Sequence, residues 1–447
     1  MLILCLNCGS SSVKYLLYNW DNREIKALGI VERVTIGGSF IIHELPGRAP
    51  LRLNHECLSY KKAIELIIDI LINSERKVID NLSKIKVVTH RVAHGGEKFT
   101  KSVLIDEDVL NMIKEVAFLA PLHNPSNIAG IEATKLLLPD TSQVAVFDTV
   151  WHQTIPSYVY IYALPYEWYK KYGIRRYGFH GTSLLYVAKR AAVLLGKNPF
   201  ECNLILCHIG NGVSINAIKL GVSLDTSMGF TPLEGAVMGT RAGDHDAAID
   251  LFMMKKEGYT PKEINNILNK KSGILGITGK YTDHRDVLKA AENNDRRAQL
   301  AIEIETYRLK KYIGAYAAIL GRVDALIFTA GVGELCNSIR AKVLKGLQHL
   351  GIKYDPEKNV LAKTRNVESD ISAADSKVKI FIIPTDEETV LVEDAVAILE
   401  GRYDVHTKFR YSFQDPNYRN KMRDERFAKE CEKNPALVKI VAKVPSR

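Results

Sequence analysis

Two arginines stand among small and polar residues, where a guanidinium group could bind an anion. Arg91 follows a short apolar run in the stretch HRVAHGG, and Arg241 lies in the stretch GTRAGD. The planar fork of arginine suits bidentate binding of carboxylate or phosphoryl oxygens. Two such groups that converge would meet the demand of phosphoryl transfer, in which negative charge spreads over the equatorial oxygens. Taken singly, each arginine is more often a surface or ion-pairing residue.

Two turns rich in Gly, Ser and Asn could hold phosphate groups through their backbone N–H groups. The first is Gly9–Ser12, with Asn7 before it and Lys14 after it, and the second runs from His208 to Gly212 in HIGNGVS. Lys14 offers a point charge, and Asn7 could orient a phosphoryl oxygen or a metal-bound water. An ordinary hairpin loop remains the alternative for the first turn. The sequence contains neither the P-loop nor the dinucleotide-binding glycine motif.

Carboxylates and one histidine complete the candidate chemistry. Asp148 follows an apolar strand, a usual place for a catalytic or metal-orienting carboxylate, although it could also cap a helix. His180 lies in the tight turn FHGT, where a structural role is more frequent than phosphoryl binding. Glu387 and Glu388 follow Pro384 and could steer Mg²⁺ through water. A solvated acidic helix start explains those two residues equally well.

The elements that must position these residues alternate between short Val- and Ile-rich runs and longer helical patterns, which is typical of an α/β fold. Residues 2–18 (LILCLNCGSSSVKYLLY) and 204–220 (LILCHIGNGVSINAIKL) each read as strand, small polar turn and strand. This likeness favours an internal duplication over two unrelated hairpins. Cys5 and Cys8 have an odd separation on a strand, so their thiols should point to opposite faces. We therefore expect no metal site there. The predicted strands are 2–8, 13–18, 86–89, 144–147, 203–207, 325–329 and 378–383, and the predicted helices are 62–73 and 184–195. After the strand 325–329 we expect a turn at 331–334 and then a further helix.

Bulk composition limits the classes of protein to consider. A chain of 447 residues is too long to fold around one compact core, so its length predicts two domains. Seven irregularly spaced cysteines do not make a disulfide framework. No basic stretch precedes the first apolar run, and no window has 18 uninterrupted apolar residues. We therefore expect a cytoplasmic protein.

Ten stretches together resemble the acetate kinase family, within the superfamily of acetate and sugar kinases, heat-shock ATPases and actin. They cover residue 1 to about residue 401 without large gaps. The stretches are LNCGSSSVKY, HRVAHGGEKF, VFDTVWH, YGFHGTS, HIGNGVS, DTSMGFTPLEG, GTRAGD, SGILGITG, FTAGVGE and IIPTDEE. The resemblance implies an α/β fold of two duplicated actin- and sugar-kinase-like (ribonuclease H-like) domains with a nucleotide cleft between them. The expected ranges are an acyl-kinase domain at 1–150, completed by about 384–402, and a nucleotide-binding domain at 151–383.

The resemblance also implies the reaction and the roles of matching residues. The reaction would be Mg²⁺- or Mn²⁺-dependent, in-line phosphoryl transfer between ATP and acetate, which forms ADP and acetyl phosphate, in a homodimer. Asn7 and Glu387 would organise the metal, Arg91 would bind the carboxylate substrate, and Asp148 would be a proton acceptor or metal-orienting carboxylate. His180 and Arg241 would stabilise the transition state. The nucleotide would contact Lys14, His208, Ile209, Gly210, Asn211, Gly212, Asp283, His284, Arg285, Gly331, Val332, Gly333, Glu334 and Leu335.

Several residues depart from the family pattern. The acyl pocket would be formed by Ala93, Leu122, Phe179 and Pro232, and Ala93 stands where the family usually has Val. Two fewer methyl groups leave room for roughly one methylene, worth about 1 kcal/mol of discrimination, so we expect propionate as a second substrate. Leu335 replaces a usual Asn that could touch the nucleotide. His245 and Ala247 also replace the usual aliphatic residue and Pro.

The segment 403–447 lies outside the resemblance and is basic, with 11 Lys and Arg against 6 Asp and Glu. We expect an amphipathic extension that packs on the body of the protein. Its aromatic residues could alternatively stack nucleic-acid bases. Three other functions stay open: propionate kinase as the main activity, a sugar kinase of the same superfamily, and a nucleotide-dependent scaffold whose tail binds RNA or a partner. Retention of Arg91, Arg241 and Asp148 argues against the scaffold, and a small apolar pocket argues against a sugar kinase. We expect no membrane or nucleic-acid partner.

Overall fold

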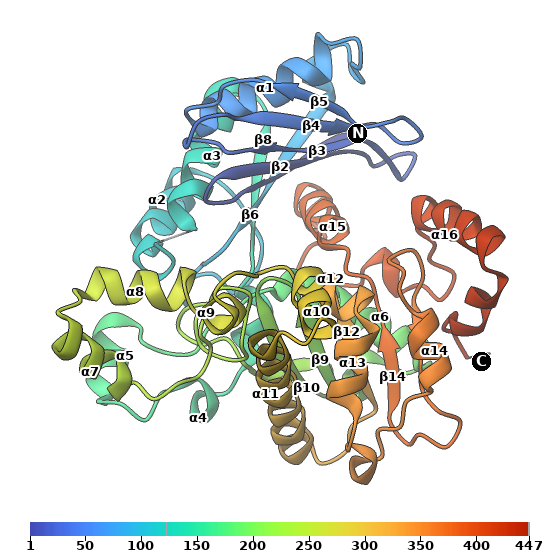
Figure 1. Ribbon diagram of the computed structural model, residues 1–447. Helices are drawn as coiled ribbons and strands as arrows, with labels where there is room; N and C mark the ends of the chain where they lie inside the picture. Colours follow the sequence, from blue (N-terminus) through green and yellow to red (C-terminus); the bar gives the residue numbers. More distant parts are fainter. Residues whose placement is uncertain (122, 446–447) are drawn as a thin grey trace. The chain divides into compact units, whose positions relative to one another are not determined.

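Two compact units make up the protein, seen here in a computed structural model that describes every residue except 122, 446 and 447. The first unit comprises Met1–Val150 and Asp386–Tyr411, and the second comprises Trp151–Thr385 and Ser412–Arg447. The chain therefore passes between the units three times (Figure 1).

The first unit is built on one mixed sheet of eight strands, drawn in blue and cyan in Figure 1. Its strand order is β5-β4-β3-β2-β1-β6-β8-β7. The hairpin partners β1 and β2 are antiparallel, whereas β6 runs parallel to both β1 and β8. The strands are β1 (Leu2–Cys8), β2 (Ser12–Asn19), β3 (Glu24–Glu32), β4 (Phe40–Glu44), β5 (Leu51–Asn54), β6 (Ile85–Val92), β7 (Val103–Leu104) and β8 (Ser142–Phe147).

Helices cover both faces of this sheet. Alternate residues of β1 enter different hydrophobic clusters, because successive side chains of a strand point to opposite faces. Leu4, Leu6 and Cys8 pack with the first of these helices, and Ile3 and Cys5 pack with the last. This arrangement confirms that the two cysteines face away from each other. The helices are α1 (Tyr60–Ile72), α2 (Glu107–Glu115), α3 (Asn124–Leu137) and α15 (Glu387–Leu399).

The second unit repeats the central plan of the first. Its sheet has the order β11-β10-β9-β12-β14-β13, in which β9 and β10 form an antiparallel hairpin and β9, β12 and β14 are parallel. In both sheets the chain begins with an antiparallel hairpin, and a later strand pairs in parallel with the first strand of that hairpin. This shared plan confirms the predicted duplication. The strands are β9 (Leu204–Ile209), β10 (Val213–Lys219), β11 (Val222–Thr226), β12 (Ala325–Thr329), β13 (Ser369–Asp370) and β14 (Lys379–Ile382).

Helices α6 and α11 both pack on the second sheet, α6 against β9 and β12 and α11 against β9 and β10. No helix in the described part of the chain is long and apolar enough to cross a membrane. The α-helices are α4 (Ser157–Tyr160), α5 (Tyr166–Tyr172), α6 (Gly181–Leu194), α7 (Ala248–Glu257), α8 (Pro261–Lys270), α9 (Gly273–Thr278), α10 (His284–Glu292), α11 (Arg296–Leu320), α12 (Ala330–Leu335), α13 (Asn337–Leu344), α14 (Pro356–Leu361) and α16 (Lys421–Lys433). Across both units, short 3-10 helices occupy Leu82–Lys84, Ala117–Leu119, Val150–Thr154, Pro199–Glu201, Gln348–Leu350, Ser412–Gln414 and Pro435–Ile440.

The glycine-containing stretch after β12 corrects one expectation. We expected a turn at residues 331–334 followed by a helix, but these residues already belong to α12. The reversal is confined to Ala330, which adopts a left-handed φ of 64°. Because one residue completes the turn, the helix begins directly after the strand.

The basic extension is an integral part of both units. Residues 403–411 belong to the first unit, and residues 412–447 belong to the second. Phe409, Tyr411 and Phe413 are buried. The packed arrangement confirms the interpretation as an extension on the body of the protein. Stacking of bases on these three rings is excluded, because their faces are already covered.

A buried carboxylate holds the first part of this extension. Asp394 in α15 accepts hydrogen bonds from Ser102 Oγ at 2.6 Å, Tyr411 Oη at 2.7 Å and Tyr403 Oη at 3.3 Å. Burial raises the pKa of Asp394 to about 6, although the three hydroxyl donors act in the opposite direction. The protonated form is therefore more favoured in the folded state than in the unfolded chain.

This difference predicts how stability depends on pH. The folded state retains the Asp394 proton to a higher pH than the unfolded chain, so its stability falls as pH rises from about 4 to about 6. Asp394→Asn should remove this contribution. Relative to the variant, the wild type should lose about 2 kcal/mol of unfolding free energy between about pH 4.5 and about pH 7. Urea titrations of both proteins at several pH values measure this difference. If the unfolding free energies of the two proteins changed with pH in the same way, the contribution assigned to Asp394 would be wrong.

Candidate active site

Three candidate residues of the first unit lie at the carboxyl ends of neighbouring parallel strands. Asn7 is near the end of β1, Arg91 is near the end of β6, and Asp148 directly follows β8. Because β6 pairs in parallel with both β1 and β8, these ends meet at one edge of the sheet. Ligands of α/β sheets bind at such edges.

Arg91 is enclosed by oxygen atoms. Its Nε donates to Asp148 Oδ1 at 2.9 Å, and its second terminal nitrogen donates to Asp148 Oδ2, which makes a bidentate pair. Asn7 Oδ1 lies 3.4 Å from the other terminal nitrogen, and Glu387 Oε2 lies 3.7 Å from Nε. Burial acts to lower the pKa of Arg91, but the charges of Asp148 and Glu387 outweigh it and the pKa is raised. The structure therefore gives the Asp148 carboxylate a charged partner.

The remaining candidates of the first unit surround this cluster. Glu387 opens α15, which is capped by the Asp386 side chain through the Thr389 N–H at 3.1 Å. Lys14 is exposed on β2 and pairs in register with Asn7. Ala93 is buried after β6, and its N–H donates to Asn127 Oδ1 at 3.0 Å. Leu122 lies outside the described residues.

In the second unit, two stacked imidazoles occupy the ends of α6 and β9. His180 precedes α6 with a left-handed φ of 59°, and its ring stacks on that of His208, with 4.2 Å between the centroids. His180 Nδ1 lies 2.9 Å from Ser214 Oγ, and His208 Nδ1 lies 2.9 Å from Ser183 Oγ. Each hydroxyl fixes the orientation of one ring. We did not single out these two serines in the sequence, although both lie in the quoted stretches YGFHGTS and HIGNGVS.

Arg241 differs from Arg91 in its surroundings. One terminal nitrogen donates to the Pro232 carbonyl at 2.7 Å, and among the described residues no carboxylate lies within 4 Å. Burial lowers the pKa of Arg241. A methyl group at Gly212 would lie 3.3 Å from Arg241 and 3.2 Å from His180. Both side chains thus converge on the turn between β9 and β10, and a partly desolvated cation without a carboxylate partner suits an anionic ligand.

The nucleotide candidates form two groups. The turn His208–Gly212 and the start of α12 follow adjacent parallel strands, because Thr329 pairs in register with His208. Asp283 instead caps α10 and pairs with the exposed Arg285, whose hydrogen bonds lower the pKa of Asp283 to about 2.

Some candidate side chains are occupied by other contacts within the second unit. His284 Nε2 lies 2.8 Å from Glu305 Oε1 between α10 and α11. Glu334 is buried, with Arg365 Nε 3.1 Å from Oε2 and the Thr385 N–H donating to Oε1 at 3.2 Å. Phe179 is buried in the hydrophobic core. Leu335 is exposed at the end of α12.

The two other departures lie around α7. His245 Nε2 lies 3.1 Å from Asp250 Oδ1 in that helix, and Ala247 immediately precedes it. Nothing in these contacts explains their difference from the family pattern.

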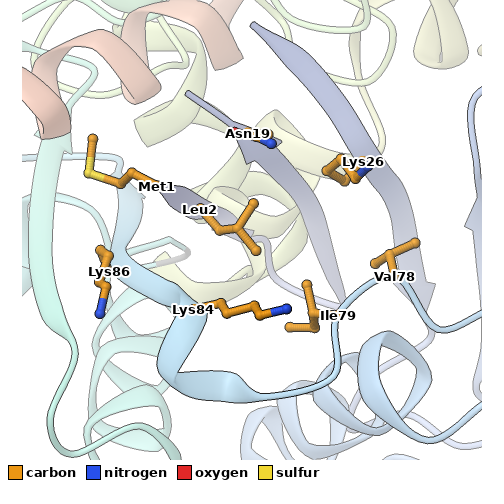
Figure 2. Close-up of a pocket in the computed structure, with 8 residues that line it drawn as sticks. All are labelled: Met1, Leu2, Asn19, Lys26, Val78, Ile79, Lys84 and Lys86. Carbon is orange, nitrogen blue, oxygen red and sulfur yellow. The ribbon is translucent and has the colours of Figure 1, made fainter. Parts of the chain in front are cut away.

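A pocket with three lysines lies elsewhere in the first unit (Figure 2). Leu2 and Lys86 line it at the starts of β1 and β6, whereas Asn7 and Arg91 lie near the ends of the same strands. Five residues of extended chain separate these positions, about 17 Å. This pocket is therefore not the site of the candidate chemistry. Its lining residues are Met1, Leu2, Asn19, Lys26, Val78, Ile79, Lys84 and Lys86.

Comparison with known proteins agrees with this geometry. The model of the Acetokinase family matches residues 2–393. An acetate kinase of Geobacter metallireducens is 61% identical over 413 residues, which are 92% of this chain and 98% of the relative. An acetate kinase of Treponema pallidum is 53% identical over 442 residues, 99% of each chain.

A solved structure is also similar. The crystal structure of Porphyromonas gingivalis acetate kinase has a TM-score of 0.84 and 44% identity, and the match covers 89% of this chain and 99% of that one. The chain therefore belongs to the acetokinase family, and it is a phosphotransferase that uses acetate and ATP.

Proposed function

We propose that the chain transfers the γ-phosphoryl group of ATP directly and in line to an acetate oxygen. The new bond joins this oxygen to phosphorus as the bond to the ADP oxygen breaks, and the reverse reaction makes ATP from acetyl phosphate. The contrast between the two partly buried arginines carries the proposal. Arg91 is already held by carboxylates, whereas Arg241 has no carboxylate within 4 Å in the described part of the chain. The two cations therefore suit different tasks.

Arg91 would bind the substrate carboxylate. Asp148 uses Nε and one terminal nitrogen, while among the described residues the other terminal nitrogen has only the long contact with Asn7 at 3.4 Å. Acetate is ionised near neutral pH, as carboxyl groups generally are, so its attack on phosphorus requires no proton acceptor. We therefore favour an orienting role for Asp148 over a role as general base.

Arg241 and His180 would stabilise the transition state. Charge accumulates on the equatorial phosphoryl oxygens, and preorganised donors aimed at them typically contribute a factor of about 10²–10³ in rate. The Pro232 carbonyl holds Arg241, and the Ser214 hydroxyl holds His180. Because both side chains are held before substrate binds, little reorganisation remains for the reaction.

Mg²⁺, or Mn²⁺ with the same oxygen ligands, would be organised by Asn7 and Glu387. The described residues include no cluster of three His, Cys, Asp or Glu side chains arranged for a metal ion. Mg²⁺ at nucleotide sites commonly uses only one or two protein carboxylates together with waters and phosphates. The amide oxygen of Asn7 and the carboxylate of Glu387, both beside Arg91, fit this demand. When bound, the metal neutralises charge on the phosphates.

The nucleotide would lie along the turn His208–Gly212 and the start of α12. Lys14 and the segment Asp283–Arg285, of which Arg285 is exposed, would be further contacts. The support is that the two turns share one edge of the second sheet. His284 and Glu334 would contribute backbone groups, because their side chains are occupied by Glu305 and Arg365.

A hydroxamate assay for acyl phosphate, with ATP, Mg²⁺ and acetate, tests the proposed roles. Arg91→Ala and Arg241→Ala should each lower kcat/KM by about 10²–10³, because each removes a charged donor. Arg48→Ala, a change at an exposed arginine of the first unit, is the matched control and should match the wild type. A wild-type rate in either arginine variant would refute that residue's role, and no acyl phosphate from the wild type would refute the activity itself.

Ala93 should admit a longer acyl group, with Phe179 and Pro232 as further pocket residues. Ala93→Val should shift the preference towards acetate, since two added methyl groups occupy the space of roughly one methylene. The ratio of kcat/KM for acetate to that for propionate should rise about fivefold, equivalent to about 1 kcal/mol. This ratio does not depend on the fraction of active enzyme. An unchanged ratio would exclude Ala93 from the pocket.

We also propose that the chain forms a homodimer through its second unit. Helices α4, α5 and α7, drawn at the lower left of Figure 1, carry large apolar side chains that are unusually exposed. Large exposed apolar patches mark interaction sites. These side chains are Tyr158, Tyr166, Trp168, Tyr172, Ile249, Leu251 and Phe252.

Sedimentation equilibrium should give twice the chain mass of 50.0 kDa. The double change Leu251→Asp and Phe252→Asp should give a monomer, because two charges would have to be buried at the interface. A wild-type monomer, or a variant that remains dimeric, would remove this surface from consideration. A cytoplasmic location is also proposed, because all seven cysteines are free thiols and disulfides persist in oxidising compartments.

A further inference from the structure

The C-terminal extension reaches the backbone next to a candidate catalytic residue. The family model ends at residue 393, so α16 lies beyond it. Arg423 in α16 donates from one terminal nitrogen to the Pro384 carbonyl at 3.1 Å and from the other to the Thr385 carbonyl at 2.6 Å. One guanidinium group thus holds two successive peptide groups.

Thr385 is held by two further contacts. Its hydroxyl donates to Ser183 Oγ at 2.7 Å, and its N–H donates to Glu334 Oε1 at 3.2 Å. Ser183 Oγ also lies 2.9 Å from His208 Nδ1. The backbone N–H, the carbonyl and the side chain of Thr385 are therefore all fixed within the second unit, beside two stretches proposed to bind nucleotide.

The chain leaves the second unit immediately after this residue. Asp386 belongs to the first unit and caps α15, and Glu387 is the first residue of that helix. Two residues of extended chain span at most about 7 Å. A carbonyl held at Thr385 consequently restricts where the first turn of α15, with the Glu387 carboxylate, can lie.

Helix α16, which carries Arg423, is held in place by further contacts. Glu430, also in α16, accepts from Thr364 Oγ1 at 2.6 Å and from Asn366 Nδ2 at 2.7 Å. Farther along the extension, Leu437 and Ile440 are buried in the core of the second unit. Because the helix is fixed by contacts at several points, Arg423 bonds to the 384–385 backbone from a rigid base.

We propose that Arg423 is a positioning residue for phosphoryl transfer and acts through Glu387. It holds the 384–385 backbone so that Glu387 starts α15 in the position that organises the metal–nucleotide complex. The inference rests on the role proposed above for Glu387. It makes the extension, which lies beyond the family model, a working part of this enzyme.

The chemistry of arginine is essential to this role. Its planar fork presents donors in two directions and bonds two carbonyls at once, whereas lysine is a single point charge. Arg423→Gln should therefore lower kcat at least tenfold and raise the Mg²⁺ concentration for half-maximal rate, while KM for acetate changes less than twofold. Arg423→Lys should restore part of kcat. Arg426→Gln, a change at an exposed arginine on the same helix, is the matched control and should match the wild type.

A double-mutant cycle separates positioning from a general loss of structure. If Arg423 acts through Glu387, Arg423→Gln should change kcat less than twofold once Glu387→Gln is present, because interacting residues are not additive. Equal effects of Arg423→Gln in both backgrounds, or a kcat within twofold of wild type in the single variant, would overturn the proposal. Should Arg423→Gln fail to fold, the same cycle with Arg423→Lys decides. A wild-type rate for Glu387→Gln alone would instead refute the proposed role of Glu387.

Discussion

The ion pair of Arg91 with the buried Asp148 is the interaction on which the arrangement of the first unit depends. A buried carboxylate needs a partner, because removal of one member of a buried ion pair typically costs about 3–5 kcal/mol. Arg91 meets this requirement through two hydrogen bonds. The two residues are 57 positions apart and can meet only because β6 and β8 are parallel neighbours in register. The register between β6 and β8 thus determines that these two side chains meet at the edge of the sheet where the candidate site lies.

Arg241 shows the opposite use of the same side chain. Its environment supplies a carbonyl oxygen but no described carboxylate within 4 Å, so burial lowers its pKa instead of being offset. A guanidinium group in this environment is stabilised most when an anionic ligand binds beside it. The duplicated plan therefore gives two sheets with similar hairpins but different electrostatics. Carboxylates surround Arg91 of the first unit, whereas Arg241 of the second unit converges with the His180 imidazole on Gly212.

The C-terminal extension shows that a basic composition does not define a function. Its charges suggested a nucleic-acid surface as one reading, yet its aromatic residues are anchors. Tyr411 is bound to Asp394 in the first unit, and Phe413 packs on Tyr186 in the second, where its carbonyl accepts from Arg190 at 2.6 Å. Tyr411 and Phe413 are only two residues apart, so one short segment is packed in both units. Apart from Arg423, the described Lys and Arg side chains of the extension are exposed, because their charged ends are hydrated at the surface, while the apolar anchors hold the segment in place.

The sequence by itself determined the types of element, the strands that carry the candidate chemistry, the duplication and, through ten stretches that resemble it, the family. The elements and the duplication are local features, since they depend on apolar periodicity and on small residues near strand ends, whereas the family came from the resemblance alone. The strands β6 and β9 continue past their predicted ends at 89 and 207, to Val92 and Ile209, so Arg91 and His208 lie within strands. Helix α12 also begins earlier than predicted, because a left-handed Ala330 shortened the turn.

Tertiary structure decided which side chains meet. The stacking of His180 on His208, the carbonyl that holds Arg241, and the contact of Arg423 with Thr385 join residues separated by many positions. Local patterns carry no information on such pairs. They follow from strand register and helix packing, which fix distances between distant parts of the chain.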